Sequence, residues 1–137
     1  MRILLAEDDQ PNRELLGRLL EHLGCEAVAV ESGNAALDAL GAPTADGAAG
    51  TPAGDGRSPR EFDVILLDYL MPGIDGLETA RRVRRVPGLE TIPIVILSGM
   101  PLSDEDGTVP GPPLRFLMKP VRLSDLRDLL SGISGGG

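Results

Sequence analysis

Val64-Ile65-Leu66-Leu67-Asp68 is a short apolar run that ends in a carboxylate. Three other runs share this form but end in polar residues of several kinds: Ile3-Leu4-Leu5-Ala6 before Glu7-Asp8-Asp9, Ile94-Val95-Ile96-Leu97 before Ser98, and Leu114 to Met118 before Lys119. Runs of this length with apolar residues on both faces are typical of strands in a buried parallel sheet. The carboxyl ends of parallel strands meet at one edge, where ligands bind. We therefore expect carboxylates, a hydroxyl and an ammonium to share one cleft.

Four helix-like segments and one further short strand separate or follow these runs. The first helix is the clearest, because Pro11 to Leu23 carries leucines at helical spacing and Asp9 is placed as its N-cap. The other elements are expected as a strand at Ala27 to Val30 and as helices after Ser32, from about Leu77 to Val86, and through Leu126 to Leu130. This alternation predicts an α/β fold with a doubly wound parallel sheet and right-handed crossovers.

Two segments interrupt the pattern. Residues 41–60 are rich in small and polar residues without an apolar period, so we interpret them as a flexible loop, most simply a tolerated insertion. Residues 101–113 hold four prolines and two glycines. These residues disfavour a regular helix, so we expect the fourth helix of the fold to be short or missing. We place the domain at residues 1–131 and expect 132–137 to be a disordered tail or linker stub.

The composition limits the classes of function. A chain of 137 residues, 42% of them hydrophobic, has material for one core. Its net charge of −8 disfavours direct nucleic-acid binding, which needs cations against the phosphates. No apolar stretch approaches the roughly 20 residues of a membrane span, so no membrane insertion is expected. The single cysteine, Cys25, cannot form an internal disulfide, which fits a reducing compartment. We expect a soluble cytoplasmic domain.

The strand-end residues favour phosphoryl chemistry. A carboxylate such as Asp68 can attack phosphorus and form an acyl phosphate, although a turn aspartate is the plainer interpretation of that residue alone. Glu7 and Asp8 supply the paired carboxylates that suit Mg²⁺, a hard cation. Lys119 offers a point charge to Asp68 or to a phosphoryl oxygen, and Ser98 offers a hydroxyl donor. A surface lysine and an ordinary strand end are the plainer alternatives for these two.

Four pieces of the sequence together resemble one known family, the receiver domain of two-component response regulators. They are ILLAEDD (3–9), DVILLDYLMPGIDG (63–76), IPIVILSG (92–99) and FLMKP (116–120), in the family's order and at similar spacing. The resemblance implies a flavodoxin-like sheet of five parallel strands in the order 2-1-3-4-5. The piece PNRELL (11–16) is similar to receivers of hybrid sensor histidine kinases.

The resemblance also implies the chemistry of the acids. Asp68 matches the residue that accepts a phosphoryl group from a histidine kinase or a histidine phosphotransfer domain. Glu7 and Asp8 match the acids that hold Mg²⁺ together with Asp68 and the backbone carbonyl of Leu70. An output domain, or a kinase on the same chain, is implied as a further partner.

Three more residues match family positions that bind the phosphoryl group or transmit the change of state. Ser98 and Lys119 match the residues that contact the phosphoryl oxygens. Phe116 stands where the family keeps a rotating aromatic ring, so Ser98 and Phe116 are the expected switch. Leu70 and Met100 stand beside the path of the attacking water, and because both are apolar we expect slow autodephosphorylation.

Two other functions fit parts of the pattern. A phosphatase of the haloacid-dehalogenase type also uses a strand-end aspartate and Mg²⁺, but it needs a second acid two residues later, where this chain has Leu70. A pseudo-receiver that only binds a partner would not need the intact set of Asp68, Ser98 and Lys119. The prediction is therefore a phosphoacceptor signalling domain with self-catalysed transfer and hydrolysis, not an enzyme acting on a separate substrate.

Overall fold

The sheet has five parallel strands. The computed structural model describes residues 1–40, 62–86, 88–100, 109 and 114–135. In chain order the strands are β1 (Arg2–Ala6), β2 (Glu26–Val30), β3 (Val64–Asp68), β4 (Ile94–Ser98) and β5 (Arg115–Met118). They lie in the order β2-β1-β3-β4-β5 and all neighbouring pairs are parallel, which confirms the predicted doubly wound sheet.

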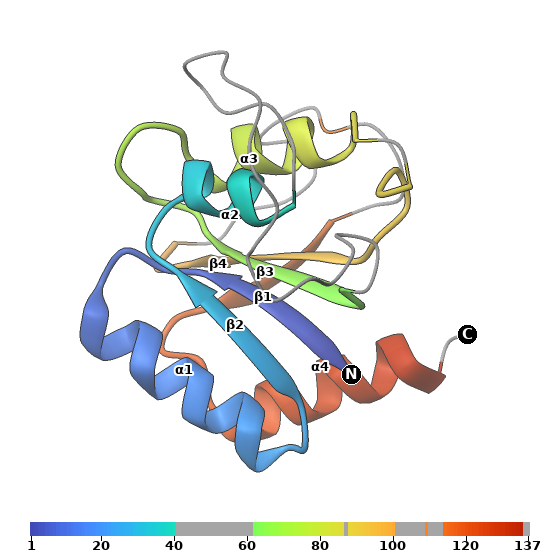
Figure 1. Ribbon diagram of the computed structural model, residues 1–137. Helices are drawn as coiled ribbons and strands as arrows, with labels where there is room; N and C mark the ends of the chain where they lie inside the picture. The colour runs from blue at the N-terminus through green and yellow to red at the C-terminus, as the bar shows by residue number, and fades with distance from the viewer. Residues whose placement is uncertain (41–61, 87, 101–108, 110–113, 136–137) are drawn as a thin grey trace.

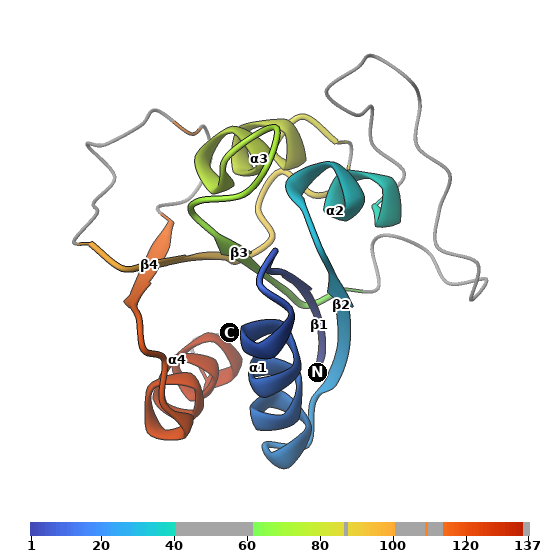
Figure 2. The ribbon, with the colours of Figure 1, turned by 90° about the vertical axis from the view of Figure 1, so that its left-hand side faces the viewer.

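The helices cover both faces of the sheet. They are α1 (Gln10–His22), α2 (Gly33–Ala39), α3 (Gly76–Val83) and α4 (Leu123–Gly135) in the described part of the chain. α2 and α3 lie together on one face, and α1 and α4 lie on the other (Figures 1 and 2). This three-layer arrangement leaves the carboxyl ends of the strands on a single edge.

Three of the helices begin with a side-chain cap close after a strand. Asp9, Ser32 and Asp75 each accept a hydrogen bond from the backbone N–H three residues later, which satisfies a donor that the helix itself cannot. The predicted cap Asp9 is therefore confirmed, and the helix expected after Ser32 is capped by that residue. The caps at Asp9 and Asp75 stabilise the chain just after β1 and β3, next to the polar residues at these strand ends.

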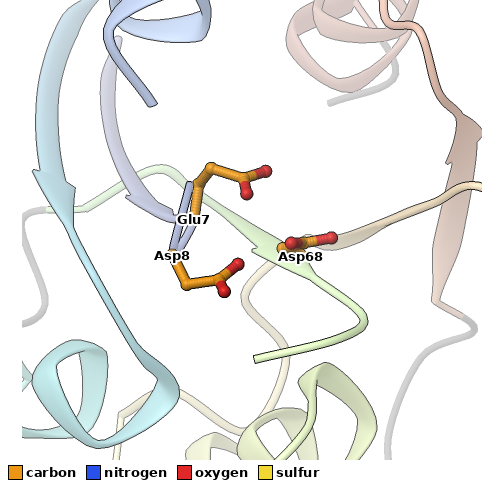
Figure 3. A group of neighbouring side chains, drawn as sticks. All are labelled: Glu7, Asp8 and Asp68. Carbon is orange, nitrogen blue, oxygen red and sulfur yellow. The ribbon is translucent and has the colours of Figure 1, made fainter. Parts of the chain in front are cut away.

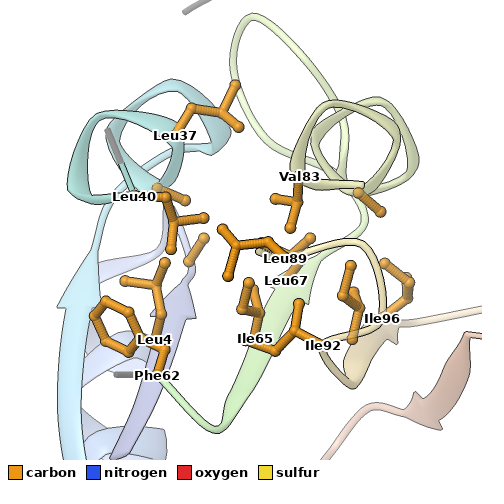
Figure 4. Packing of buried hydrophobic residues seen from close by; sticks show 14 of the residues in the cluster. Leu4, Leu37, Leu40, Phe62, Ile65, Leu67, Val83, Leu89, Ile92 and Ile96 are labelled. Carbon is orange, nitrogen blue, oxygen red and sulfur yellow. The ribbon is translucent and has the colours of Figure 1, made fainter. Parts of the chain in front are cut away.

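The core is almost entirely aliphatic and lies in two layers. β1, β3 and β4 are buried along their whole length, as expected for central strands with helices on both faces. One cluster packs between the sheet and α2 and α3; Figure 4 shows Leu4, Leu67, Val83 and Ile96 among its members. The other packs between the sheet and α1 and α4. The two layers hold the strands in register.

The C-terminal ends of two helices differ by more than one residue from the sequence-based expectation. The third helix, expected to about Val86, ends at Val83, and the backbone N–H of Arg85 and of Val86 each donates to the carbonyl three residues earlier. α4 continues to Gly135, so residues 132–135, expected to begin a disordered tail, are helical. Ile133 packs partly buried against the second core cluster, which stabilises this extra turn.

Other expectations fall on residues that are not described. The loop at 41–60 lies outside the described residues, and so does the segment 101–113 except for Val109. Among the helices in the described ranges, none combines the length and the hydropathy needed to cross a membrane.

Candidate functional site

Three carboxylates meet where β1 and β3 end. The two strands are neighbours with Ala6 opposite Leu67, so Glu7 and Asp68 follow directly at the same level. One oxygen from each of Glu7, Asp8 and Asp68 lies within 4.8 Å of the others. Figure 3 shows the three side chains at the ends of their strands. Glu7 and Asp68 are buried, whereas Asp8 is exposed. The cluster thus has one open side.

Lys119, directly after β5, reaches two of these acids. Its Nζ lies 2.8 Å from Oδ1 of Asp68 and 3.0 Å from Oε2 of Glu7. Burial alone lowers the pKa of Lys119, but the bonds to Asp68 and Glu7 outweigh it and raise the pKa above its ordinary value. The ammonium therefore stays charged at neutral pH and offsets part of the repulsion among the carboxylates.

For Glu7, unlike Lys119, burial outweighs the hydrogen bond that favours the charged form. Desolvation raises the pKa of the Glu7 carboxyl, the hydrogen bond from Lys119 lowers it, and the nearby Asp68 raises it further, so the net direction is upward. With all groups charged, three carboxylates and one ammonium leave a formal charge of −2 at the cluster. This charge and the hard oxygen donors match one small divalent cation.

Ser98 ends β4, on the other side of β3 from β1. Leu97 lies opposite Asp68, so Ser98 follows at the same edge of the sheet. Its buried side-chain Oγ accepts a hydrogen bond of 3.0 Å from the N–H of Met100. Its backbone carbonyl accepts a bond of 2.7 Å from the N–H of Lys119. Ser98 and Lys119 are thus tied to each other through the backbone.

Leu70 and Phe116 occupy different environments. The Leu70 side chain is 64% exposed, in the turn after β3. Phe116, on β5, is partly buried and packs against the cluster beneath α2 and α3. The structure brings Glu7, Asp8, Asp68 and Lys119 into contact or near-contact, and it leaves the expected roles of Leu70, Ser98 and Phe116 as predictions.

The backbone at the start of α3 lies close to the backbone of Asp68, a contact that the sequence did not predict. The N–H of Gly76, the first residue of α3, donates to the carbonyl of Tyr69 at 2.8 Å. A Cβ atom on Gly76 would lie 2.6 Å from the backbone oxygen of Asp68. Only glycine allows α3 to begin this close to the strand end that carries Asp68.

Arg13 is a second residue at the site that sequence reasoning did not find. From the first turn of α1, its Nη1 donates to the backbone carbonyl of Glu7 at 2.9 Å. The one signal available in the sequence was position: Arg13 comes one helical turn after the cap Asp9, on the end of the helix that faces the acids. An exposed arginine on a helix gives the same signal, so the contact needed the structure.

Comparison with known proteins gives one consistent result. The sequence matches the response regulator receiver domain family over residues 3–131. Two-component response regulator ARR15 of Arabidopsis thaliana is 32% identical over 139 residues, which cover 100% of this chain and 64% of that protein. The chain therefore spans less than two thirds of the length of this relative.

Two solved receiver domains have folds similar to that of this chain. The receiver domain (CheY-like) from Methylobacillus flagellatus has a TM-score of 0.71 at 26% identity, over 97% of this chain and 98% of that one. The receiver domain of sensor histidine kinase PA1611 from Pseudomonas aeruginosa PAO1 has a TM-score of 0.73 at 24% identity, over 98% of this chain and 97% of that one. In that second structure a magnesium ion is coordinated in the active site cleft.

Proposed function

We propose, from the premise that this chain belongs to the response regulator receiver domain family, that Asp68 accepts a phosphoryl group from a histidine kinase or a histidine phosphotransfer domain. One observation carries the proposal. The ammonium of Lys119 lies 2.8 Å from Oδ1 of Asp68 within a cluster of three strand-end carboxylates. A phosphoacceptor needs this combination of a nucleophilic oxygen, a fixed cation and donors for a divalent metal.

We assign Mg²⁺ as the cofactor, held by the carboxylates of Glu7, Asp8 and Asp68 and by the backbone carbonyl of Leu70. The three carboxylates fit this ion because their oxygens lie within 4.8 Å of one another and one side of the cluster is exposed. The magnesium ion in the Pseudomonas receiver structure is consistent with the assignment. When bound, Mg²⁺ supplies charge neutralisation for the phosphoryl oxygens.

The transfer itself is a displacement at phosphorus. An oxygen of Asp68 forms the new P–O bond while the P–N bond of the donor's phosphohistidine breaks, and the electron pair of that bond remains on the imidazole nitrogen. Lys119 and the hydroxyl of Ser98 stabilise the charge on the phosphoryl oxygens. Hydrolysis later returns Asp68 and releases inorganic phosphate, when water attacks phosphorus and the P–O bond to Asp68 breaks.

The same residues connect the site to an output. Ser98 moves toward the phosphoryl group, and Phe116 follows into the space that this movement opens. The family match covers residues 3–131. The domain that undergoes these movements extends beyond the expected limit of residue 131, because α4 continues to Gly135 and Ile133 packs against the core. Its place is the cytoplasm, and its partners are the phosphodonor and an output domain or kinase on the same chain. It is a phosphoacceptor that catalyses its own modification.

The proposal is tested with acetyl phosphate as a small phosphodonor and intact mass as the readout. Wild-type protein should gain a single phosphoryl group with Mg²⁺ present and should gain none with EDTA. Asp68→Asn should not be labelled, whereas Asp9→Asn should be, because asparagine caps α1 as well as aspartate does. Labelling of Asp68→Asn at wild-type yield would overturn the assignment.

A further inference from the structure

One residue of α1 holds the turn that carries the acid pair. The backbone N–H of Arg13 donates to the carbonyl of Asp9 at 2.8 Å, and its side-chain Nη1 donates to the carbonyl of Glu7 at 2.9 Å. Both carbonyls that flank Asp8 in this turn are therefore bonded to Arg13. On the other side, the N–H of Glu7 donates to the carbonyl of Val30, at the end of β2, at 3.0 Å.

The carboxylate of Asp8 has no comparable support of its own. The Glu7 carboxylate accepts bonds from Asp9 N–H at 3.2 Å and from Lys119 at 3.0 Å. The Asp8 side chain is exposed, and no described residue hydrogen-bonds or ion-pairs with it. Its position is set by its backbone alone.

The contact from Arg13 controls that backbone directly. The carbonyl of Glu7 and the N–H of Asp8 belong to one planar peptide unit. A guanidinium that fixes the carbonyl therefore fixes the plane, and with it the direction in which Asp8 leaves the chain. Without this bond the plane can turn, and Asp8 can swing away from Glu7 and Asp68. Removing a group that orients a metal ligand typically lowers the affinity for the metal by about 10- to 100-fold.

We propose that Arg13 is a positioning residue for Mg²⁺ binding: it orients Asp8 by holding the Glu7 carbonyl, and phosphoryl transfer depends on it through the metal. This inference rests on the proposed function. Arg13 touches neither Asp68 nor the reacting atoms, so its effect is indirect. Its positive charge is a second way in which it can act on the acids, and the experiment separates the two.

The test compares Arg13→Met with Arg18→Met. Both changes remove one arginine from α1, but Arg18 is exposed and makes no contact with the turn in the described structure. Mg²⁺ affinity is measured by isothermal titration calorimetry on the intact chain. Arg13→Met should weaken Mg²⁺ binding by about 10-fold, whereas Arg18→Met should stay within about twofold, because exposed charges without direct contact are screened by salt. Arg13→Lys, which keeps a donor and a charge, should recover part of the loss.

A spectroscopic readout on the metal-free protein tests the contact itself. The carbonyl ¹³C shift of Glu7 and the amide shift of Asp8 should change in Arg13→Met and not in Arg18→Met. General destabilisation would not single out this peptide, and unfolding in urea checks that both variants are folded.

The outcomes separate the two claims. A wild-type protein that binds no Mg²⁺ overturns the proposed function, and the Glu7 carbonyl shift still decides whether Arg13 holds the turn. A wild-type protein that binds Mg²⁺ while Arg13→Met binds it equally well overturns the role of Arg13 alone. Equal losses in Arg13→Met and Arg18→Met would assign the effect to charge and would overturn positioning.

Discussion

Replacing Gly76 with alanine should destabilise the domain and disturb Asp68 together. The added Cβ would lie 2.6 Å from the backbone oxygen of Asp68, 3.1 Å from Cα of Tyr69 and 3.2 Å from the carbonyl carbon of Asp68. All three are backbone atoms, so relief requires a shift of α3 or of the end of β3. Overpacking of this kind costs about 1–3 kcal/mol, while alanine gains at most about 1 kcal/mol over glycine in a helix. We expect a net loss of about 1–2 kcal/mol.

Urea unfolding followed by far-UV circular dichroism measures this loss, and Gly17→Ala provides the matched control. Gly17 lies within α1, and nothing lies within 4 Å of the position its Cβ would take. That substitution should therefore stabilise the protein by about 0.5–1 kcal/mol. A Gly76→Ala protein as stable as wild type, or stabilised like Gly17→Ala, would refute the steric argument.

The same substitution should slow labelling of Asp68 by acetyl phosphate, on the order of 10-fold, because small displacements of reacting groups are costly. The displaced atom is the carbonyl oxygen of Asp68 itself. Labelling of Gly76→Ala at the wild-type rate, in a protein that is destabilised as expected, would show that the strain is absorbed by α3 and not by the strand end.

Three further predictions concern the acids and the exposed apolar residue beside them. Asp8→Ala should weaken Mg²⁺ binding by about 10-fold or more, and calorimetry showing unchanged affinity would contradict the metal assignment. In metal-free protein, burial raises the pKa of the Glu7 carboxyl above 4.5. The stability that the protonated Glu7 contributes is therefore full below pH 4.5 and is lost as the pH rises through the raised pKa of the folded state. The unfolding free energy of wild type minus that of Glu7→Gln should thus decrease from pH 4.5 to neutrality; an increase would show the wrong sign. Leu70, 64% exposed, cannot orient water, so Leu70→Glu or Leu70→Asn should shorten the lifetime of the phosphorylated protein in a gel-shift assay, and an unchanged or longer lifetime would rule this out.

The arrangement of the acids could be predicted from the sequence because it depends on strand ends. Apolar runs before Glu7 and Asp68 identify β1 and β3, and in a parallel sheet neighbouring strands end together. The N-cap Asp9 fixed the start of α1 in the same way. These features are local in the chain, and the sheet then brings them together.

The remaining contacts depend on how elements pack, which no local pattern encodes. The bond from Arg13 to the Glu7 carbonyl requires the orientation of α1 against β1, and the close approach of Gly76 requires the distance of α3 from β3. The length of α4 was underestimated for a related reason. Gly132 disfavours a helix by about 1 kcal/mol, but packing of Ile133 against the core outweighs it.

The most direct test of the central claim is to locate the phosphoryl group after transfer from a phosphorylated histidine phosphotransfer domain. Borohydride reduces an aspartyl phosphate to homoserine, so peptide mass spectrometry of the treated protein identifies the residue that was modified. We expect homoserine at position 68, formed only when Mg²⁺ is present during transfer. Homoserine at Asp8 or another aspartate, the corresponding alcohol with one more methylene at Glu7 or another glutamate, or no reduced residue in a protein that retains bound phosphate, would contradict this expectation.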